Sequence, residues 1–249
     1  MIILLLLTAL ACRERDDKSS KTVWNTKEEA ELSKVHNQLL DIEKRQGWKL
    51  LFDGKTLDGW HVFNAPQGDS AWEVREGTLY CNALDESKIQ GDLVTDAVYE
   101  NYELSLEWKI SPRGNSGIFI NVLEGPELGA AWQSGPEYQI LEPGHMDQDV
   151  ETKKSGCLYG FYPQKNEAIT KSEGEWNHTK IIQNEGKVEF YLNGILTAEE
   201  DFTSSSWKDK VAASGFKDHK AFGSVTKGKI ALQDWYFEVW FRNIKIREL

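Results

Sequence analysis

The stretch Glu103-Leu-Ser-Leu-Glu-Trp-Lys-Ile110 decides the fold, because apolar and polar residues alternate along its whole length. Leu104, Leu106, Trp108 and Ile110 fall on one face of an extended chain, and the polar residues between them fall on the other. Successive side chains of a β-strand point to opposite sides of the sheet. The stretch therefore predicts a strand with one buried face and one face toward water.

Comparable strand patterns occupy most of the sequence after residue 47, at 117–122, 138–142, 179–183, 187–192, 229–232 and 239–247. Asn184-Glu-Gly186 separates two of them as a hairpin turn would, and Asn193-Gly194 ends the second. No internal repeat of roughly 20–50 residues is visible, which disfavours a propeller or a solenoid. We therefore expect one all-β domain over residues 47–249, built as an antiparallel sandwich.

The composition limits the partners of the chain. Among 249 residues, 29 Lys and Arg stand against 40 Asp and Glu, and the net charge is −11. Nucleic acids and anionic lipid surfaces attract cationic proteins, so this charge argues against both as main partners. The 10 Trp, 8 Tyr and 10 Phe favour strands and broad flat contacts, including the stacking of sugar rings.

Residues 1–11 have the pattern of a signal peptide. Residues 2–11 form an apolar run broken only by Thr8, about the length of a signal-peptide core and too short to span a membrane. Ala9-Leu10-Ala11-Cys12 is typical of a bacterial lipoprotein cleavage site, which makes Cys12 the lipidated first residue of the mature chain. Two features depart from this pattern, because no Lys or Arg precedes the run and Ala9 stands where Leu is usual. Cleavage without lipidation and a stray apolar tail remain open.

This interpretation predicts an exported protein, in the periplasm or outer membrane, that meets the membrane only through the lipid on Cys12. Residues 12–46 then form a tether and an N-terminal helix. Thr26-Lys-Glu-Glu29 matches a capping box at the start of that helix. Apolar residues recur at three- and four-residue spacing toward residue 45, namely Leu32, Val35, Leu39 and Ile42.

The remaining cysteines, Cys81 and Cys157, leave two interpretations open. Export permits a disulfide between them, and two buried free thiols fit the sequence equally well. The sequence has no Cys-x-x-Cys motif and no His–Cys cluster, so we do not expect a structural zinc site.

Polar residues within the predicted strands are candidates for a site on the surface of a sheet. Glu137 and Gln139 share one face of their strand. Gly114-Asn-Ser-Gly117 joins two strands, and its glycines permit a tight turn and the close approach of a ligand. Each position also fits an ordinary polar residue facing solvent, and Asn115 fits a turn.

The spacing of acidic residues disfavours a conventional glycosidase. Retaining hydrolysis needs two carboxyl groups about 5–5.5 Å apart. Glu103 and Glu107 are the best acidic pair on one strand face, and they are about 13 Å apart along the strand. The Glu-x-Asp-x-Glu pattern of sandwich glycosidases is missing. Carboxylates from separate strands can still pair, so this class remains open.

A series of short motifs follows in order over residues 47–249: Trp48-Lys-Leu-Leu-Phe-Asp-Gly54, Leu57-Asp-Gly-Trp60, Gly114-Asn-Ser-Gly-Ile118, Glu137-Tyr-Gln-Ile-Leu-Glu142, His145-Met-Asp147, Gly156-Cys-Leu-Tyr159, Glu175-Trp-Asn177, Leu192-Asn-Gly194, Ile230-Ala-Leu-Gln-Asp234 and Phe241-Arg-Asn-Ile244. Together they resemble the 3-keto-disaccharide hydrolase, or 3-keto-glucoside lyase/hydratase, domain family, which was formerly a domain of unknown function. The resemblance implies a concanavalin A-like jelly-roll β-sandwich and an exported bacterial lipoprotein.

The resemblance also implies a reaction on an oxidised (3-keto) glycoside or disaccharide. A ketone at C3 makes the hydrogen on C2 acidic, so a base can remove it and form an enolate. The group on C1 then leaves by β-elimination, and water adds to the resulting 2-hydroxy-glucal. Such a site needs a base, a group that stabilises the enolate oxygen, and an acid near the leaving group.

Candidate roles follow from the same resemblance. Glu137 and His145 are the catalytic candidates, as base or acid. The residues that we expect to bind the sugar hydroxyls or the enolate are Asn115, Gln139, Asp147, Tyr159, Asp234 and Arg242. No metal is implied, although a divalent cation held by Glu, His and Asp is an option for stabilising an enolate.

Three positions depart from the family pattern. Trp235 replaces the usual His after Leu-Gln-Asp, Glu142 replaces Asp, and Met146 replaces Pro. If the missing imidazole is essential, the chain has altered activity or only binds sugar. Trp235 can instead supply a stacking platform for substrate. An enzyme acting on 3-keto-glycosides is therefore our first hypothesis, and a noncatalytic carbohydrate-binding lipoprotein is the alternative.

Overall fold

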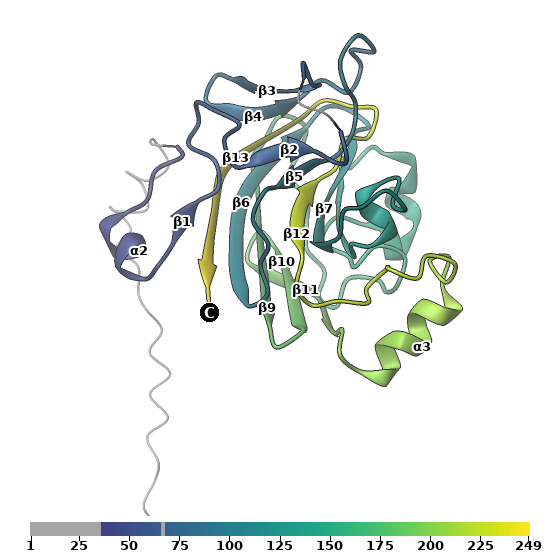
Figure 1. Cartoon of the computed structure of the whole chain (residues 1–249). Coiled ribbons are helices and arrows are strands. Elements are labelled where there is room, and N and C mark those ends of the chain that lie inside the picture. Colours follow the sequence, from purple (N-terminus) through teal and green to yellow (C-terminus); the bar gives the residue numbers. More distant parts are fainter. Residues whose placement is uncertain (1–35, 66–67) are drawn as a thin grey trace, which may run out of the picture. The chain divides into compact units, whose positions relative to one another are not determined.

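The protein is described from a computed structural model, which covers residues 36–65 and 68–249 and consists mainly of two antiparallel sheets (Figure 1). The larger sheet has the strand order β11 (Ile195–Asp201), β10 (Lys187–Leu192), β9 (Asn177–Asn184), β6 (Tyr102–Ile110), β13 (Val239–Glu248), β4 (Thr78–Cys81) and β3 (Trp72–Arg75), with β1 (Lys49–Leu50) also paired to β13. The smaller sheet has the order β2 (Trp60–Val62), β5 (Leu93–Thr95), β12 (Lys229–Leu232), β7 (Asn115–Val122) and β8 (Glu137–Leu141). The prediction of an all-β jelly-roll sandwich is confirmed.

The main core lies between the inner faces of the two sheets. Leu104, Leu106 and Trp108 of β6 are buried in one cluster with Ile118 and Ile120 of β7. The alternation predicted for β6 is confirmed, because the intervening Glu and Lys side chains lie on the other face and remain partly exposed. Every strand predicted from the sequence is present, with ends that differ by no more than two residues.

A second apolar cluster covers part of the outer face of the smaller sheet. It contains Phe63, Val94, Phe119, Val122, Ala131 and Ala231. The short 3-10 helix η1 (Ala131–Gln133) packs on this cluster beside β7. The rest of that outer face is left to polar side chains, which are the subject of the next subsection.

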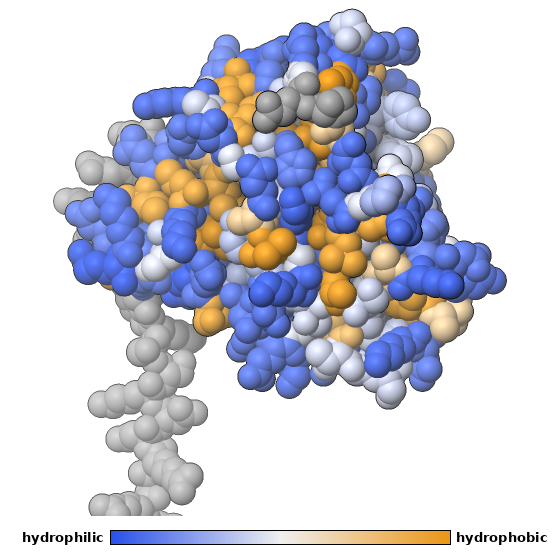
Figure 2. All heavy atoms as spheres, viewed as in Figure 1, coloured by the Kyte–Doolittle hydropathy of each residue, from blue (hydrophilic) through white to orange (hydrophobic). Residues whose placement is uncertain are grey.

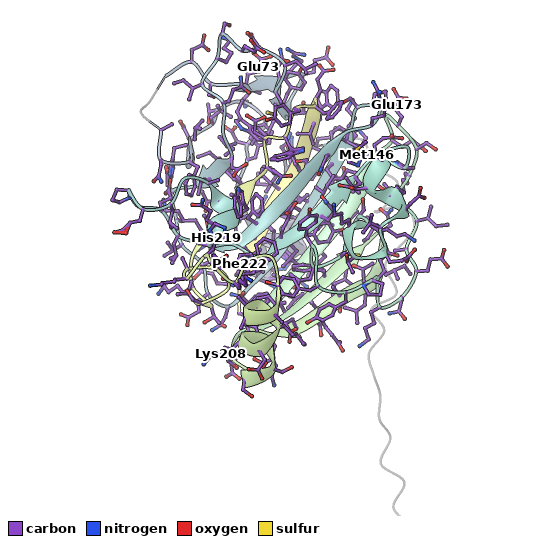
Figure 3. The ribbon with its side chains drawn as sticks, turned by 90° about the vertical axis from the view of Figure 1, so that its right-hand side faces the viewer. Glu73, Met146, Glu173, Lys208, His219 and Phe222 are labelled. Atoms are coloured by element: carbon purple, nitrogen blue, oxygen red, sulfur yellow. The ribbon has the colours of Figure 1, made fainter. Side chains whose placement is uncertain are left out.

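The remaining helical segments lie in connections. After β8 come η2 (Met146–Asp149) and η3 (Glu151–Lys153), and α3 (Ser205–Ala213) follows β11. Ser204 caps α3 by accepting a hydrogen bond from the Trp207 N–H at 3.0 Å. Figure 3 labels Lys208 on α3, and His219 and Phe222 on the loop that leads back from the helix to the sheets.

The N-terminal helix is shorter than predicted. Within the described residues it spans only α2 (Asp41–Arg45), and residues 36–40 are not helical. Asn37 has a φ of 56°, and it exchanges hydrogen bonds with Asn243 of β13 at 2.7 and 2.9 Å. These hydrogen bonds to β13 keep residues 36–40 from forming a helix. The predicted start at Thr26, with Leu32 and Val35, lies outside the described residues.

The described compact unit runs from His36 to Leu249 and therefore includes residues that we had assigned to the tether. The predicted signal peptide, the predicted lipidation site Cys12 and most of the predicted tether lie outside the described residues. Within the described part of the chain, no helix is long and apolar enough to cross a membrane. The face of the molecule in Figure 2 is largely hydrophilic, with separate hydrophobic patches between the polar side chains.

Cys81 and Cys157 are both buried and both free. Of the two interpretations that the sequence left open, the structure therefore favours buried thiols over a disulfide. Burial raises the pKa of each thiol above its ordinary value, so both remain protonated at neutral pH.

A buried amide pair joins the two sheets. The Asn121 side chain on β7 donates to Gln183 of β9 at 2.7 Å, and the Gln183 amide donates back at 3.1 Å. The same Gln183 amide donates to the carbonyl oxygens of Glu100 and Thr226, at 2.6 and 2.7 Å. The fully buried Gln183 amide therefore pairs with the buried Asn121 side chain and with two partly buried carbonyl oxygens.

Gln183→Ala is expected to lower the free energy of unfolding by about 3 kcal/mol, because it leaves the buried Asn121 amide and two partly buried carbonyl oxygens without their partner. Gln46→Ala, at an exposed position after α2, is the matched control and should change stability by less than about 0.5 kcal/mol. Chemical denaturation of both variants measures the difference. Equal stability of the two variants would contradict this account of the amide pair.

Candidate functional site

A row of polar residues crosses the outer face of the smaller sheet. Gln233 follows β12, its N–H donates to Gly117 of β7 at 2.9 Å, and Gly117 pairs with Gln139 of β8. Asp92 stands on the other side of Gln233, because Leu232 pairs with Leu93 of β5. We call Asp92, Gln233, Gly117 and Gln139 the polar row. Their sequence neighbours Leu93, Leu232, Ile118 and Tyr138 lie in the main core, so the polar row faces outward.

Glu137 leans over Gly117 into the polar row. A Cβ atom at Gly117 would lie 2.3 Å from Oε1 of Glu137, so only glycine leaves room for the carboxyl group in this position. Glu137 is 8% exposed. Burial, together with the negative charge of Asp92, raises the pKa of Glu137 well above its ordinary value. The carboxyl group is therefore suited to hold a proton near neutral pH.

Asp92 and Asp234 are two further acidic groups whose pKa values are raised, as that of Glu137 is. Burial raises the pKa of Asp92 to about 7, although its carboxylate accepts the N–H groups of Asp234 and Ala131 at 3.1 and 3.3 Å. Burial also raises the pKa of Asp234, whose carboxylate accepts the Gly91 N–H at 2.9 Å. A group with a pKa near 7 can both take up and release a proton at neutral pH, as general acid–base catalysis requires.

Two amide oxygens beside these acids lack hydrogen-bond partners within the described residues. They are Oδ1 of Asn115 and Oε1 of Gln233, and both are buried. Buried acceptors are nearly always satisfied in proteins, so an unpaired one points to a donor from a ligand or from water. Sugar hydroxyl groups are such donors.

Tyr159 extends the polar surface beyond β8. Leu158 forms a bridge with Tyr138, and the Tyr159 N–H donates to the Glu137 carbonyl at 3.0 Å. Leu158 belongs to the main core, so Tyr159 is on the outer side, next to Glu137. The Lys153 ammonium group lies 5.8 Å from the Tyr159 ring centroid and 3.2 Å from Oδ1 of Asp147.

His145 is linked to this group through Asp147. It is the N-cap residue of η2, and its Nδ1 accepts the Asp147 N–H at 3.0 Å. Nδ1 is therefore occupied by a structural bond, and Nε2 is the nitrogen left for proton transfer. Met146, labelled in Figure 3, is 85% exposed beside it.

Trp235 and Tyr236 form an aromatic rim next to the acids. They directly follow Asp234, their side chains are 44% and 68% exposed, and their ring centroids are 5.2 Å apart. Exposed rings of this size are available for stacking on a sugar. This placement is consistent with the stacking role considered for Trp235.

Arg242 is not part of this group. Phe241 is buried in the main core, so the next residue of β13 points outward from the larger sheet, on the opposite side of the sandwich. There the Arg242 Nε donates to Glu107 at 2.5 Å, and its guanidinium group lies 3.9 Å from the Trp176 ring centroid. The expectation that Arg242 joins Glu137 is therefore wrong for this structure. The other site residues predicted from the sequence lie in or beside the polar row, or in the adjoining segment 145–159.

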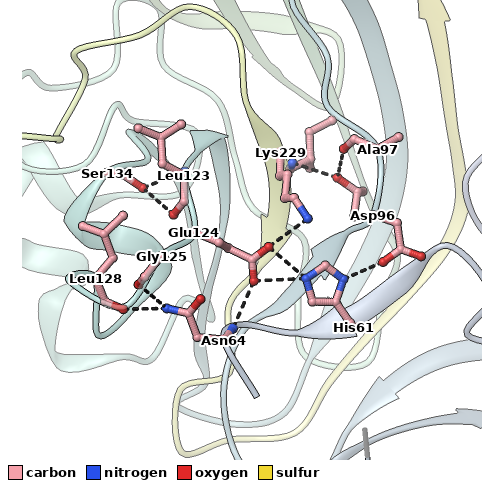
Figure 4. A network of polar contacts seen from close by, with 12 residues as sticks. His61, Asn64, Asp96, Ala97, Leu123, Glu124, Gly125, Leu128, Ser134 and Lys229 are labelled. Carbon is pink, nitrogen blue, oxygen red and sulfur yellow. Dashed lines mark hydrogen bonds and ion pairs between the residues drawn. The ribbon is translucent and has the colours of Figure 1, made fainter. Parts of the chain in front are cut away.

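A separate polar network stands at the far end of the same outer face (Figure 4). His61 of β2 contacts Asp96 through Nδ1 at 2.6 Å and Glu124 through Nε2 at 2.9 Å. Lys229 of β12 pairs with Glu124 at 2.8 Å. The second apolar cluster lies between this network and Glu137, so the network braces the sheet edge and is not part of the site.

The structure adds Asp92, Gln233 and Lys153 to the residues found from the sequence. The sequence contained a signal for Asp92, which directly precedes the short apolar stretch Leu93-Val-Thr95. A polar residue at the start of a short strand can face a site. Among residues 36–65 and 68–249, no three His, Cys, Asp or Glu side chains cluster closely enough to hold a metal ion.

Comparison with known proteins gives the family. Residues 47–247 match the 3-keto-alpha-glucoside-1,2-lyase-like domain. A 3-keto-disaccharide hydrolase of Bacteroides thetaiotaomicron is 32% identical over 229 residues, covering 82% of this chain and 79% of that protein. A crystal structure from Parabacteroides distasonis, provisionally named a glycosyl hydrolase, has 31% identity and a TM-score of 0.78, over 86% of this chain and 100% of that chain. The chain therefore belongs to the 3-keto-alpha-glucoside-1,2-lyase-like family, as the sequence motifs predicted.

The raised pKa of Asp92 predicts a pH dependence of stability. The folded protein keeps a proton on Asp92 up to a pH of about 7, whereas an unfolded chain releases it near pH 4. The folded state thus binds more protons, and this group lowers the free energy of unfolding by up to about 4 kcal/mol as pH rises from about 4 to about 8.

Asp92→Asn is expected to remove this part of the pH dependence, because an amide does not ionise. Loss of one accepted hydrogen bond adds a pH-independent offset, so the slope between about pH 4 and about pH 8 is the diagnostic quantity. Denaturation of the wild type, Asp92→Asn and the exposed control Asp58→Asn measures it. An Asp92→Asn slope equal to that of the control would show that Asp92 titrates normally.

Proposed function

We propose that this chain is an exported enzyme that cleaves 3-keto-glycosides by proton abstraction at C2, β-elimination at C1 and hydration of the 2-hydroxy-glucal. Family membership and the similarity to a 3-keto-disaccharide hydrolase support the cleavage of a carbohydrate. The observation that carries the proposal is the Glu137 carboxyl group over Gly117, with Asp92 close enough to raise its pKa.

The acids fit the two proton transfers of the elimination. At neutral pH Asp92 is partly ionised, and its negative charge favours the protonated form of Glu137, so the pair holds one proton. The ionised member removes the C2 hydrogen, which the neighbouring ketone has made acidic. The protonated member donates to the oxygen that leaves C1. His145 Nε2 is the other candidate for this donation.

The surrounding groups fit a sugar ring. The unpaired oxygens of Asn115 and Gln233 accept hydroxyl protons, Asp147 and Tyr159 extend the polar surface, and the buried Gln139 amide lies beside them. Trp235 and Tyr236 offer stacking surfaces at the rim, beside Asp234. After elimination, water adds its hydroxyl group to C1 and a solvent proton reaches C2, so the net reaction is hydrolysis.

The proposal predicts which substrate is cleaved. Purified protein, incubated with a 3-keto-disaccharide and with its unoxidised parent, should release product only from the keto sugar. In D₂O the released 3-keto-glucose should carry deuterium at C2, because that hydrogen is exchanged during elimination and hydration. Cleavage of the parent sugar would instead indicate a conventional glycosidase, and binding without cleavage a noncatalytic sugar-binding protein.

Glu137→Gln is expected to lower kcat/KM on the keto sugar by about 100-fold or more, because the amide cannot carry the transferred proton. Glu248→Gln is the matched control, since Glu248 is exposed and its ion pair among the described residues is with Lys49 at 3.0 Å. Both variants should unfold at the wild-type temperature within a few degrees. Full turnover by Glu137→Gln would remove Glu137 from the reaction.

The export part of the proposal rests on the sequence of residues 1–12. Cells grown with labelled palmitate should incorporate the label into the wild-type chain, and Cys12→Ala should abolish incorporation because the acceptor thiol is gone. Ser19→Ala, in the same segment, should retain it. Labelling of the Cys12→Ala chain would show that Cys12 is not the lipidated residue, and an unlabelled wild type would argue for cleavage without lipidation or for no export.

A further inference from the structure

A pocket of about 590 Å³ opens on the outer face of the larger sheet. Trp176, Trp240, Lys109 and Arg242 form its wall on the strand side, and we call it the tryptophan pocket. Its volume is in the range of small-molecule sites. Because β6 and β13 bury their inner faces in the core, this pocket and the polar row lie on opposite sides of the sandwich.

Lys109 is the distinctive group of the tryptophan pocket. Its ammonium nitrogen lies 4.8 Å from the Trp240 ring centroid and 5.3 Å from that of Trp176. No carboxylate within the described residues forms an ion pair with it, unlike Arg242, which pairs with Glu107. A positive charge is thus held between two indole rings without an acidic partner.

The other charges of the pocket are already engaged or lie at its edge. Arg75 pairs with Glu73 at 2.6 Å. Asp53 accepts the backbone N–H groups of Lys55 and Thr56, both at 2.8 Å. Lys55 and Glu76 are exposed residues of the pocket wall with opposite charges. These contacts leave Lys109 as the group best placed to attract an anion.

Arg242 is fixed in an orientation that supports such a ligand. Its Nε donates to Glu107, its Nη1 contacts His36 Nε2 at 2.9 Å, and it stacks on Trp176. Burial and the adjacent guanidinium charge lower the pKa of His36, so the imidazole is neutral and accepts this hydrogen bond. The remaining guanidinium N–H groups are available to a ligand oxygen.

We propose that the tryptophan pocket is a second carbohydrate site, which binds a sugar acid through its carboxylate on Lys109 and packs the sugar ring against the sides of Trp176 and Trp240 that Lys109 and Arg242 leave open. Indole groups pack well on the apolar parts of a sugar, and an ammonium group forms a charge-assisted hydrogen bond with a carboxylate. The net charge of −11 repels anions in general, so binding of an acid requires a local cationic site of this kind. This inference does not depend on the proposed reaction.

The test is a titration of the full chain with D-glucuronate, D-glucose and inorganic phosphate, followed by the indole N–H signals in ¹H–¹⁵N spectra. Trp176→Phe and Trp240→Phe assign the two relevant signals. We expect glucuronate to shift both signals and to bind at least about tenfold more tightly than glucose, because only glucuronate has a carboxylate for Lys109. Other indole signals should remain in place and report an intact fold.

Lys109→Met should weaken glucuronate binding about tenfold or more while leaving the spectrum folded. The matched control is Lys180→Met, because Lys180 also lies on the outer face of the larger sheet and 4.4 Å from a Tyr191 ring centroid. Glu137→Gln should bind glucuronate normally, which separates this pocket from the polar row. The proposal is overturned if neither signal shifts, if Lys109→Met binds like the wild type, or if phosphate or glucose binds as tightly as glucuronate.

Discussion

Trp108 and Leu106 of β6 and Ile118 of β7 are buried in the single cluster that joins the two sheets, and every other feature of the molecule is arranged around this packing. A strand that buries one face must present its other face outward. The sandwich consequently has two outer faces, which cannot communicate through a shared cleft because the core fills the space between them. This constraint explains why the molecule carries two separate polar surfaces.

On the smaller sheet, the candidate site depends on the absence of a side chain at Gly117. Gly117 leaves the space into which Glu137 turns, and the partial burial of that space raises the pKa values of Glu137 and Asp92. The same sheet covers its other half with the second apolar cluster and η1. Burial of the acids and exposure of Trp235 at the rim are therefore two consequences of how loops cover one sheet face.

On the larger sheet, the outward residues are long charged side chains and tryptophans. Several of the charges pair across strands, as Arg242 does with Glu107 and Arg247 with Glu103, and this pairing fixes their positions. Lys109 lacks such a partner among the described residues and contacts indole rings instead. The two outer faces differ in character, since one concentrates acids that hold protons and the other presents cations on aromatic rings.

The sequence by itself determined the local features. Alternation with a period of two identified β6 to β10, β12 and β13, and it placed Glu137 and Gln139 on one face. It did not identify β1 to β5 or β11. The first five have only two to four residues, a length at which a period is hard to recognise, and burial along β11 does not alternate. It also extended the N-terminal helix through residues 36–40, where the bonds between Asn37 and Asn243 of β13 prevent a helix.

Only the tertiary structure decided which strands are neighbours. Asp92 reaches Gln233 and Gly117 because β5, β12 and β7 pair although they are far apart in the chain, and local periodicity contains no information on such pairing. For the same reason the family motif around Arg242 could not reveal that β13 belongs to the other sheet. Side-chain alternation specifies the face of a strand, and the order of strands in space then specifies which faces form a site.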